Sequence, residues 1–168
     1  PTQPSVSASV TVRVSAAGSA SQSGTWLWDV HGWWYRYEDG SYPSDTTLVL
    51  DGATYRFDAA GYMRTGWVSE RGVWYYHHAS GAQAKGWVLD GVHWYYMDPD
   101  TGAMVTGWLQ VGGTWYYLSP ANGAMVTGWF KDGDHWFYLH HGSGAMATGW
   151  VRIYMKWYQF NEAGQLIS

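Results

Sequence analysis

The chain has 168 residues, a formal net charge of −4 and no cysteine. Its nine lysines and arginines form no basic block, so a protein that tracks a nucleic-acid backbone is not expected. Without cysteine, neither a disulfide framework nor a thiolate metal site can form, and no apolar run approaches the roughly 20 residues of a membrane-spanning helix.

Residues 1–24 are expected to be a linker that contains one possible strand. The ends of this segment are rich in Pro, Ser, Gly and Ala. Between about residues 5 and 15, small apolar side chains alternate with polar ones, which is the period-two pattern of a β-strand. The chain starts at Pro1 rather than at Met, so we also expect a fragment or a processed form of a larger protein.

Residues 25–168 are predicted to form one repeat domain. A Gly-Trp pair recurs every 20 or 21 residues, and a second Trp follows seven positions later. A fixed period of this length is typical of a stacked repeat array. The clear copies have the Trp pairs Trp67 and Trp74, Trp87 and Trp94, Trp108 and Trp115, Trp129 and Trp136, and Trp150 and Trp157. With two worn copies before them we predict seven units: 26–47, 48–66, 67–86, 87–107, 108–128, 129–149 and 150–168.

These two worn copies are degenerate repeats that lack the regular Trp pattern. We expect Trp26 and Trp34 to take the two Trp positions in the first copy, and Leu48 and Tyr55 to take them in the second.

Each repeat is predicted to be a β-hairpin. Asp90-Gly91 is a favoured centre for a two-residue turn, and a turn at this point would place Trp87 directly opposite Trp94. The same reasoning pairs Trp129 with Trp136, and Leu48 with Tyr55. Because a lone hairpin is marginal in water, the hairpins must stack, and the predicted fold class is an all-β solenoid of hairpins.

Stacked hairpins of this kind would form an aromatic box at each junction. The two Trp of one hairpin, the middle aromatic residue of the next hairpin and a Met of the linking loop would supply the walls. Such a box without a carboxylate suits a cation that cannot donate hydrogen bonds, namely quaternary ammonium. Alternatively, these aromatic residues only hold the stack together, which we expect for Tyr76, Tyr96 and Tyr117.

The pattern GWxxxxGxWYYxxxxxGxMxTGW, found at residues 107–129, resembles the choline-binding repeat family. The resemblance covers residues 24–168 and includes the C-terminal modules of pneumococcal autolysin-type wall hydrolases. It implies a left-handed superhelix of hairpins that binds choline of teichoic acid between neighbouring hairpins. It also implies a secreted protein at the wall of a Gram-positive bacterium or in its phage, and a possible homodimer through the terminal repeats.

Carried over residue by residue, the resemblance implies four choline boxes. They are Trp67 and Trp74 with Tyr95, where Gln83 replaces the Met; Trp87, Trp94 and Met104 with Tyr116; Trp108, Trp115 and Met125 with Phe137; and Trp129, Trp136 and Met146 with Tyr158. The junctions of the two worn copies are not expected to form boxes, because one lacks both Trp and the other would meet Arg56.

Two other functions are compatible with the same repeats. Sugars also stack on Trp, so the repeats could bind a glucan or the glycan of peptidoglycan, although the polar residues of the loops vary between copies. The array could also be a structural stalk that binds no small ligand.

Catalysis is not expected in this chain. Asp98 and Asp100 lie in a Pro/Gly turn, where Asp is common for local hydrogen bonding. The pair His77 and His78 and the pair His140 and His141 are expected at the surface rather than on a metal. We therefore expect no metal and no cofactor, and a catalytic domain of a wall hydrolase elsewhere in the whole protein.

Overall fold

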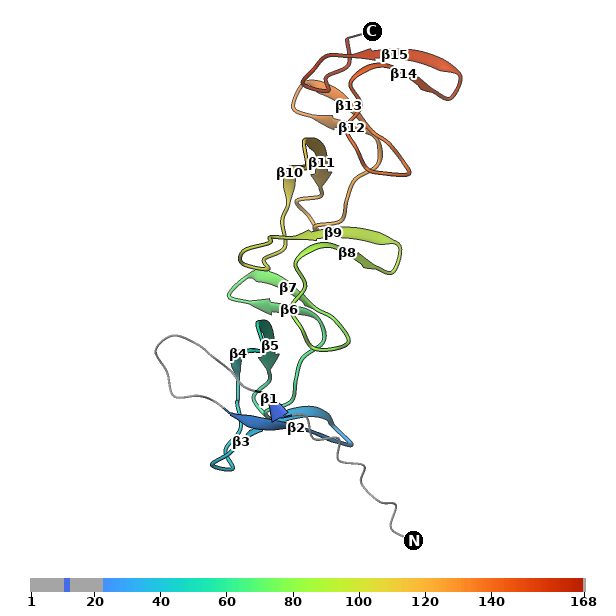
Figure 1. The fold of residues 1–168 in the computed structure, drawn as a ribbon. Coiled ribbons are helices and arrows are strands. Elements are labelled where there is room, and N and C mark those ends of the chain that lie inside the picture. Colours follow the sequence, from blue (N-terminus) through green and yellow to red (C-terminus); the bar gives the residue numbers. More distant parts are fainter. Residues whose placement is uncertain (1–10, 13–22, 168) are drawn as a thin grey trace. The chain divides into compact units, whose positions relative to one another are not determined.

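The computed structural model describes residues 11–12 and 23–167, and every regular element among them is a β-strand (Figure 1). The strands are β1 (Thr11–Val12), β2 (Gly24–Asp29), β3 (Gly32–Tyr37), β4 (Thr46–Leu50), β5 (Ala53–Phe57), β6 (Gly66–Glu70), β7 (Val73–His77), β8 (Gly86–Asp90), β9 (His93–Met97), β10 (Gly107–Val111), β11 (Thr114–Leu118), β12 (Gly128–Asp132), β13 (His135–Leu139), β14 (Gly149–Ile153) and β15 (Lys156–Phe160). The all-β class with repeated hairpins is thus confirmed.

From β2 onward, consecutive strands pair as antiparallel hairpins. The short strand β1 pairs with the start of β2, with Val12 opposite Gly24. The rest of the strand expected between residues 5 and 15 lies outside the described residues.

The hairpin turns differ in type, and this changes the predicted register. Asp51 and Gly52 both have positive φ, as a type I′ turn requires, and Leu48 faces Tyr55 as predicted. In the hairpin of β8 and β9, Asp90 instead pairs with His93, so the turn is Gly91-Val92 and only Gly91 has positive φ, as in type II′. The predicted turn was therefore wrong by one residue there.

This shift changes the cross-strand partners of the Trp residues. Trp87 lies opposite Tyr96, and Trp94 lies opposite Leu89. In the hairpin of β12 and β13, Trp129 likewise lies opposite Tyr138 rather than opposite Trp136. The two Trp of a hairpin are therefore diagonal neighbours on one face, a spacing that aromatic side chains still span.

The chain divides into two compact units. The first, which ends at Ala84, contains the hairpins from β2 to β7. Its core consists of Tyr35, Leu48, Leu50 and Phe57, and Trp26, Tyr37, Tyr55 and Met63 pack against this core. The last position of the second strand is apolar in most hairpins, but in β7 it is His77. His77 was expected at the surface, and this was wrong: its imidazole is buried, bonds through Nδ1 to the Gly81 carbonyl oxygen at 2.9 Å, and burial lowers its pKa.

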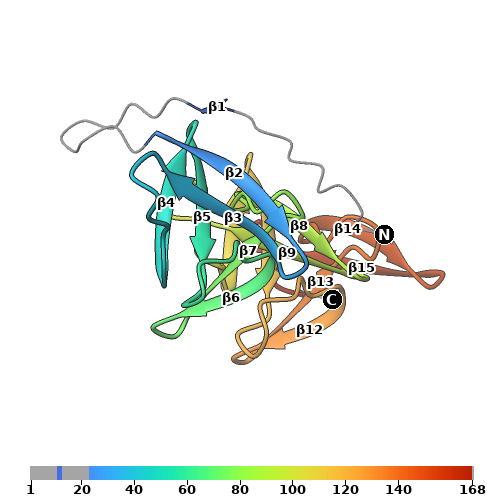
Figure 2. The same ribbon diagram turned by 90° about the horizontal axis from the view of Figure 1, so that it is seen from below.

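The second unit, from Lys85, contains the hairpins from β8 to β15. In Figure 1 the hairpins β8–β9 and β14–β15 point the same way, whereas the two hairpins between them point elsewhere. In Figure 2, β12 again points in a different direction from β14 and β15. Near its C-terminal end, Tyr138, Ala147, Ile153 and Phe160 form a buried cluster.

Backbone hydrogen bonds connect each hairpin to the second linking loop that follows it in the chain. The Met125 N–H donates to the Trp94 carbonyl oxygen at 2.7 Å, and the Met146 N–H donates to the Trp115 carbonyl oxygen at 2.8 Å. The Gly of the Gly-x-Met motif is required by close packing, since a Cβ on Gly144 would lie 2.3 Å from the Met125 sulfur. Its φ of +73° also disfavours any residue with a side chain. These contacts fix where each Met side chain lies.

Candidate functional site

An open pocket of about 280 Å³ lies at the junction between the first two hairpins of the second unit. Its lining residues are Trp87, Trp94, Tyr116, Met125, Gly142 and Ser143. The two Trp come from one hairpin and Tyr116 from the next, while Met125, Gly142 and Ser143 come from two later loops. We call this set of walls the Trp87 box.

The rings of the Trp87 box stand nearly perpendicular to one another. The ring centroids of Trp87 and Trp94 are 6.4 Å apart with an interplanar angle of 88°, and those of Trp87 and Tyr116 are 4.9 Å apart at 70°. Trp87 is half-buried, whereas Trp94 is 41% exposed, and both line the pocket. Edge-to-face packing thus holds the walls, and the open side can admit a small ligand.

The next two junctions repeat this geometry. Trp108 and Trp115 are 6.4 Å apart at 82°, and Phe137 lies 4.8 Å from Trp108. Trp129 and Trp136 are also 6.4 Å apart at 82°, and Tyr158 lies 4.8 Å from Trp129. The structure therefore brings together the three ring walls expected at each of these junctions.

The sequence analysis assigned to each box the Met of the wrong repeat, one repeat before the correct one in the chain. Met104, which was expected in the Trp87 box, does not line that pocket, and Met125 does. By the same backbone contacts, Met146 belongs with Trp115 and Leu166 belongs with Trp136, whose carbonyl oxygen accepts from the Leu166 N–H at 2.8 Å. The reason is the stacking: a linking loop closes over the hairpin before the one that it follows.

Two boxes carry charged groups at their edges. The Trp108 indole N–H donates to Asp132 Oδ2 at 2.9 Å, which orients that ring and adds a negative charge beside the box. In the box of Trp129, Trp136 and Tyr158, the Lys156 ammonium lies 5.1 Å from the Tyr158 ring centroid. The first group favours a bound cation, and the second opposes one.

The first hairpin of the first unit has Trp at both wall positions, one of which the sequence analysis missed. Trp26 lies 5.0 Å from Tyr55 of the next hairpin, and the Met63 N–H donates to the Trp33 carbonyl oxygen at 2.7 Å. Trp33, not Trp34, therefore takes the second Trp position of this hairpin. Its side chain is 39% exposed, a value similar to the 41% of Trp94. The signal was present in the sequence, because Trp33 follows Trp26 by the same seven residues.

The second hairpin of this unit has no Trp wall. Its register places Thr47 and Thr54, rather than Leu48 and Tyr55, at the two Trp positions. The Gln83 N–H donates to the Thr54 carbonyl oxygen, so Gln83 belongs to this junction and not to that of Trp67 and Trp74. Trp67 and Trp74 lie 6.5 Å apart in the first unit, and their closure by Tyr95 stays a prediction.

The polar residues considered for catalysis act locally. Asp98 accepts hydrogen bonds from the backbone N–H and the hydroxyl of Thr101 and from the Asp100 N–H, and these bonds lower its pKa. Within residues 11–12 and 23–167, no group of three or more His, Cys, Asp or Glu could hold a metal ion. None of the described residues forms a helix long and apolar enough to span a membrane.

The comparisons agree with this architecture. The sequence profile of the choline-binding repeat matches residues 65–106 and 105–149. No curated protein matches the chain in sequence.

Solved structures from pneumococcus and its phage resemble the whole chain or most of it. CbpJ from Streptococcus pneumoniae TIGR4 is 31% identical with a TM-score of 0.79, and choline binding protein F from Streptococcus pneumoniae is 29% identical with a TM-score of 0.78. Each alignment covers 98% of this chain, which spans 66% of the length of each of these proteins. The pneumococcal cell wall endolysin from phage Cp-1, complexed with choline, is 43% identical over 74% of this chain and 37% of its own, with a TM-score of 0.56. With its profile match, its stacked hairpins and its repeated Trp pairs, the chain belongs to the choline-binding repeat family.

Proposed function

We propose that this chain is a non-catalytic cell-wall anchoring module that binds choline of teichoic acid in its aromatic boxes. The observation that carries this proposal is the Trp87 box, a small open pocket with three aromatic walls and a Met. None of its lining side chains carries a charge, so a ligand with hydrogen-bond donors would find few partners there. A methylated ammonium loses little on desolvation and gains cation–π attraction from each ring.

The endolysin from phage Cp-1 and choline binding protein F support this ligand and this setting. The first was solved with choline, and the second in the presence of a peptidoglycan analogue. We infer that the whole protein acts at the wall of a Gram-positive bacterium or in its phage, with any catalytic domain, such as a wall hydrolase, outside this chain. Exposed Trp150 and Trp157 would be the contact surface of a homodimer.

Titration calorimetry of the chain with choline tests the proposal. We expect weak binding at several sites, because each ring contributes about 0.5–2 kcal/mol and one box should bind near millimolar. The variant Trp94→Ala should lose about one site, at a cost of about 1–3 kcal/mol there. The control is Tyr154→Ala, which removes an exposed aromatic side chain from the turn of the last described hairpin, outside every box, and should keep the number of sites.

A glycan in the same boxes is the alternative, and competition separates the two. Maltotetraose should leave the choline isotherm unchanged, whereas a glycan that occupies the boxes would displace choline. Retention on a column that bears diethylaminoethyl groups, followed by elution with free choline, gives an independent test. Absence of choline binding in calorimetry would reduce the chain to a structural stalk.

A further inference from the structure

A pocket of a different chemical character lies in the first unit, between its second and third hairpins. Its volume is about 680 Å³, and its lining residues are Asp45, Thr46, Thr47, Arg56, Ser69, Glu70, Arg71, Val73 and Tyr75. It takes the place that an aromatic box takes at the other junctions. We call it the Arg56 pocket.

The Arg56 pocket keeps only one wall of a choline box. Tyr75 is the middle aromatic residue of its hairpin, like Tyr116 in the Trp87 box. The two Trp positions hold Thr47 and Thr54, and Arg56 stands opposite Thr47 where the boxes have an aromatic residue. A quaternary ammonium would therefore meet one ring and a like charge, so choline is disfavoured here.

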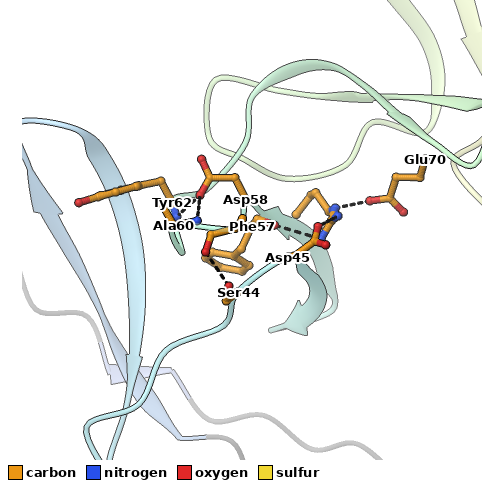
Figure 3. A network of polar contacts seen from close by, with 9 residues as sticks. Ser44, Asp45, Phe57, Asp58, Ala60, Tyr62 and Glu70 are labelled. Atoms are coloured by element: carbon orange, nitrogen blue, oxygen red, sulfur yellow. Dashed lines mark hydrogen bonds and ion pairs between the residues drawn. The ribbon is translucent and has the colours of Figure 1, made fainter.

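Each of the three nitrogens of the Arg56 guanidinium contacts a protein oxygen, and Figure 3 shows the polar contacts around Asp45, Phe57 and Glu70, which supply these oxygens. Its Nη2 pairs with Asp45 Oδ1 at 2.5 Å, its Nε pairs with Glu70 Oε1, and its Nη1 donates to the Phe57 carbonyl oxygen at 3.0 Å. The side chain is only 17% exposed, so these contacts hold it in one orientation. The two arginines of the lining, Arg56 and Arg71, are matched by the carboxylates of Asp45 and Glu70, so the pocket has no net charge to attract an anion.

The remaining groups suit a neutral ligand that carries hydroxyl groups. Thr47 and Ser69 add two hydroxyl groups to the pocket lining. Asp45 is 73% exposed, and each carboxylate has one oxygen that Arg56 does not contact. Tyr75 adds an aromatic ring to this polar wall. A pyranose has this combination, with an apolar C–H face to stack on a ring and hydroxyls around its edge.

We propose that the Arg56 pocket binds a neutral saccharide unit. This site lies beyond the choline boxes and does not depend on them, since no residue is shared between the two. A wall polymer that carries both sugar and choline would then engage the module through two kinds of contact.

Ligand-detected NMR of the full chain with chitotetraose and with maltotetraose, each in the presence of saturating choline, tests this proposal. At least one of the two probes should bind at millimolar concentration. The double variant Thr47→Val/Ser69→Ala should weaken that binding by about tenfold, because two hydrogen bonds are lost. It should leave choline binding unchanged, and Val retains the strand preference of Thr.

The matched control is Thr25→Val, which removes a strand hydroxyl outside the Arg56 pocket and should bind the saccharide as the unchanged chain does. The proposal is overturned if neither probe binds, if the double variant binds as tightly as the control, or if choline displaces the saccharide. Because choline binding is measured on the same samples, failure of this proposal is distinguishable from failure of the choline proposal.

Discussion

At the scale of single residues, a built-in cation distinguishes one box from the others. Lys156 pairs with Ile153 next to the hairpin turn, and its ammonium lies against the Tyr158 ring. The equivalent position beside Tyr116 is Thr114, which pairs with Val111 and carries no charge. The box of Trp129, Trp136 and Tyr158 thus has an internal competitor for its ring and a repulsive charge for any bound cation.

Exchanging these two side chains should exchange the affinities of their boxes. Lys156→Thr should tighten choline binding at its box by about two- to fivefold, because a like charge about 6 Å away costs about 0.5–1 kcal/mol in water-like surroundings. Thr114→Lys should weaken the Trp87 box by a similar factor. Choline titrations that follow the indole N–H signals of Trp136 and Trp94 by NMR measure each box separately. Unchanged affinity in both variants would mean that these ammonium groups point into solvent when choline binds.

Residue-level prediction succeeded where it depended on side-chain parity. The register error moved the partner of Trp87 from Trp94 to Tyr96, a shift of two residues, and side chains two residues apart share a face. The Trp pair therefore stayed on the face that was predicted. The Met walls could not be assigned from parity, because they depend on how far each loop reaches along the stack.

At the scale of the hairpin, the two central turn residues determine how much backbone strain the turn contains. Gly112 and Gly113 both have positive φ, the conformation that Gly adopts without strain. The last described hairpin uses Tyr154 and Met155 for the same turn, with φ of 47° and 70°. Both side chains are exposed, so no packing compensates for the backbone cost.

Replacing this turn should stabilise the last hairpin. Tyr154→Asn/Met155→Gly should raise its local free energy of opening by about 1–2 kcal/mol, because left-handed backbone costs other residues about that much. Hydrogen exchange of the β14 and β15 amides measures the change, and exchange in β8 and β9 should not alter. The control Gly112→Ala/Gly113→Ala should have the opposite effect on β10 and β11. Faster exchange in the replaced hairpin would show that the Tyr154 and Met155 side chains stabilise it.

The Asp-Gly motif illustrates what the sequence leaves open at this scale. Asp51-Gly52 forms both central positions of its turn, whereas Asp90 is the last residue of its strand and only Gly91 enters the turn. Both turns accept Gly at a position with positive φ. Packing of the flanking strands, which a local motif does not encode, selects between them.

At the scale of the whole chain, the repeat pattern predicted the fold class and the family, because each hairpin must bury its aromatic face against a neighbour. It also predicted that the second hairpin lacks both Trp walls, but it assigned the wrong residues to those positions and missed Trp33 in the first hairpin. The first hairpin has Trp26 and Trp33 at the two wall positions, whereas the second has Thr47 and Thr54 there. The stack therefore tolerates the replacement of both Trp walls at one junction.

Several weak boxes gain useful strength only together. A box that binds choline near millimolar holds a polymer poorly, but a second box on the same chain meets the next choline at an effective concentration that is also about millimolar. Each added box should then multiply the affinity for a choline-bearing polymer severalfold to about tenfold. Trp115→Ala should therefore reduce affinity for choline-decorated teichoic acid by that factor, and Trp94→Ala/Trp115→Ala by about its square. Surface plasmon resonance on the immobilised polymer measures both affinities. The control is the affinity of the intact boxes for free choline, which should not change in either variant. If the double variant binds the polymer as the single variant does, the boxes act one at a time, and the polymer does not span them.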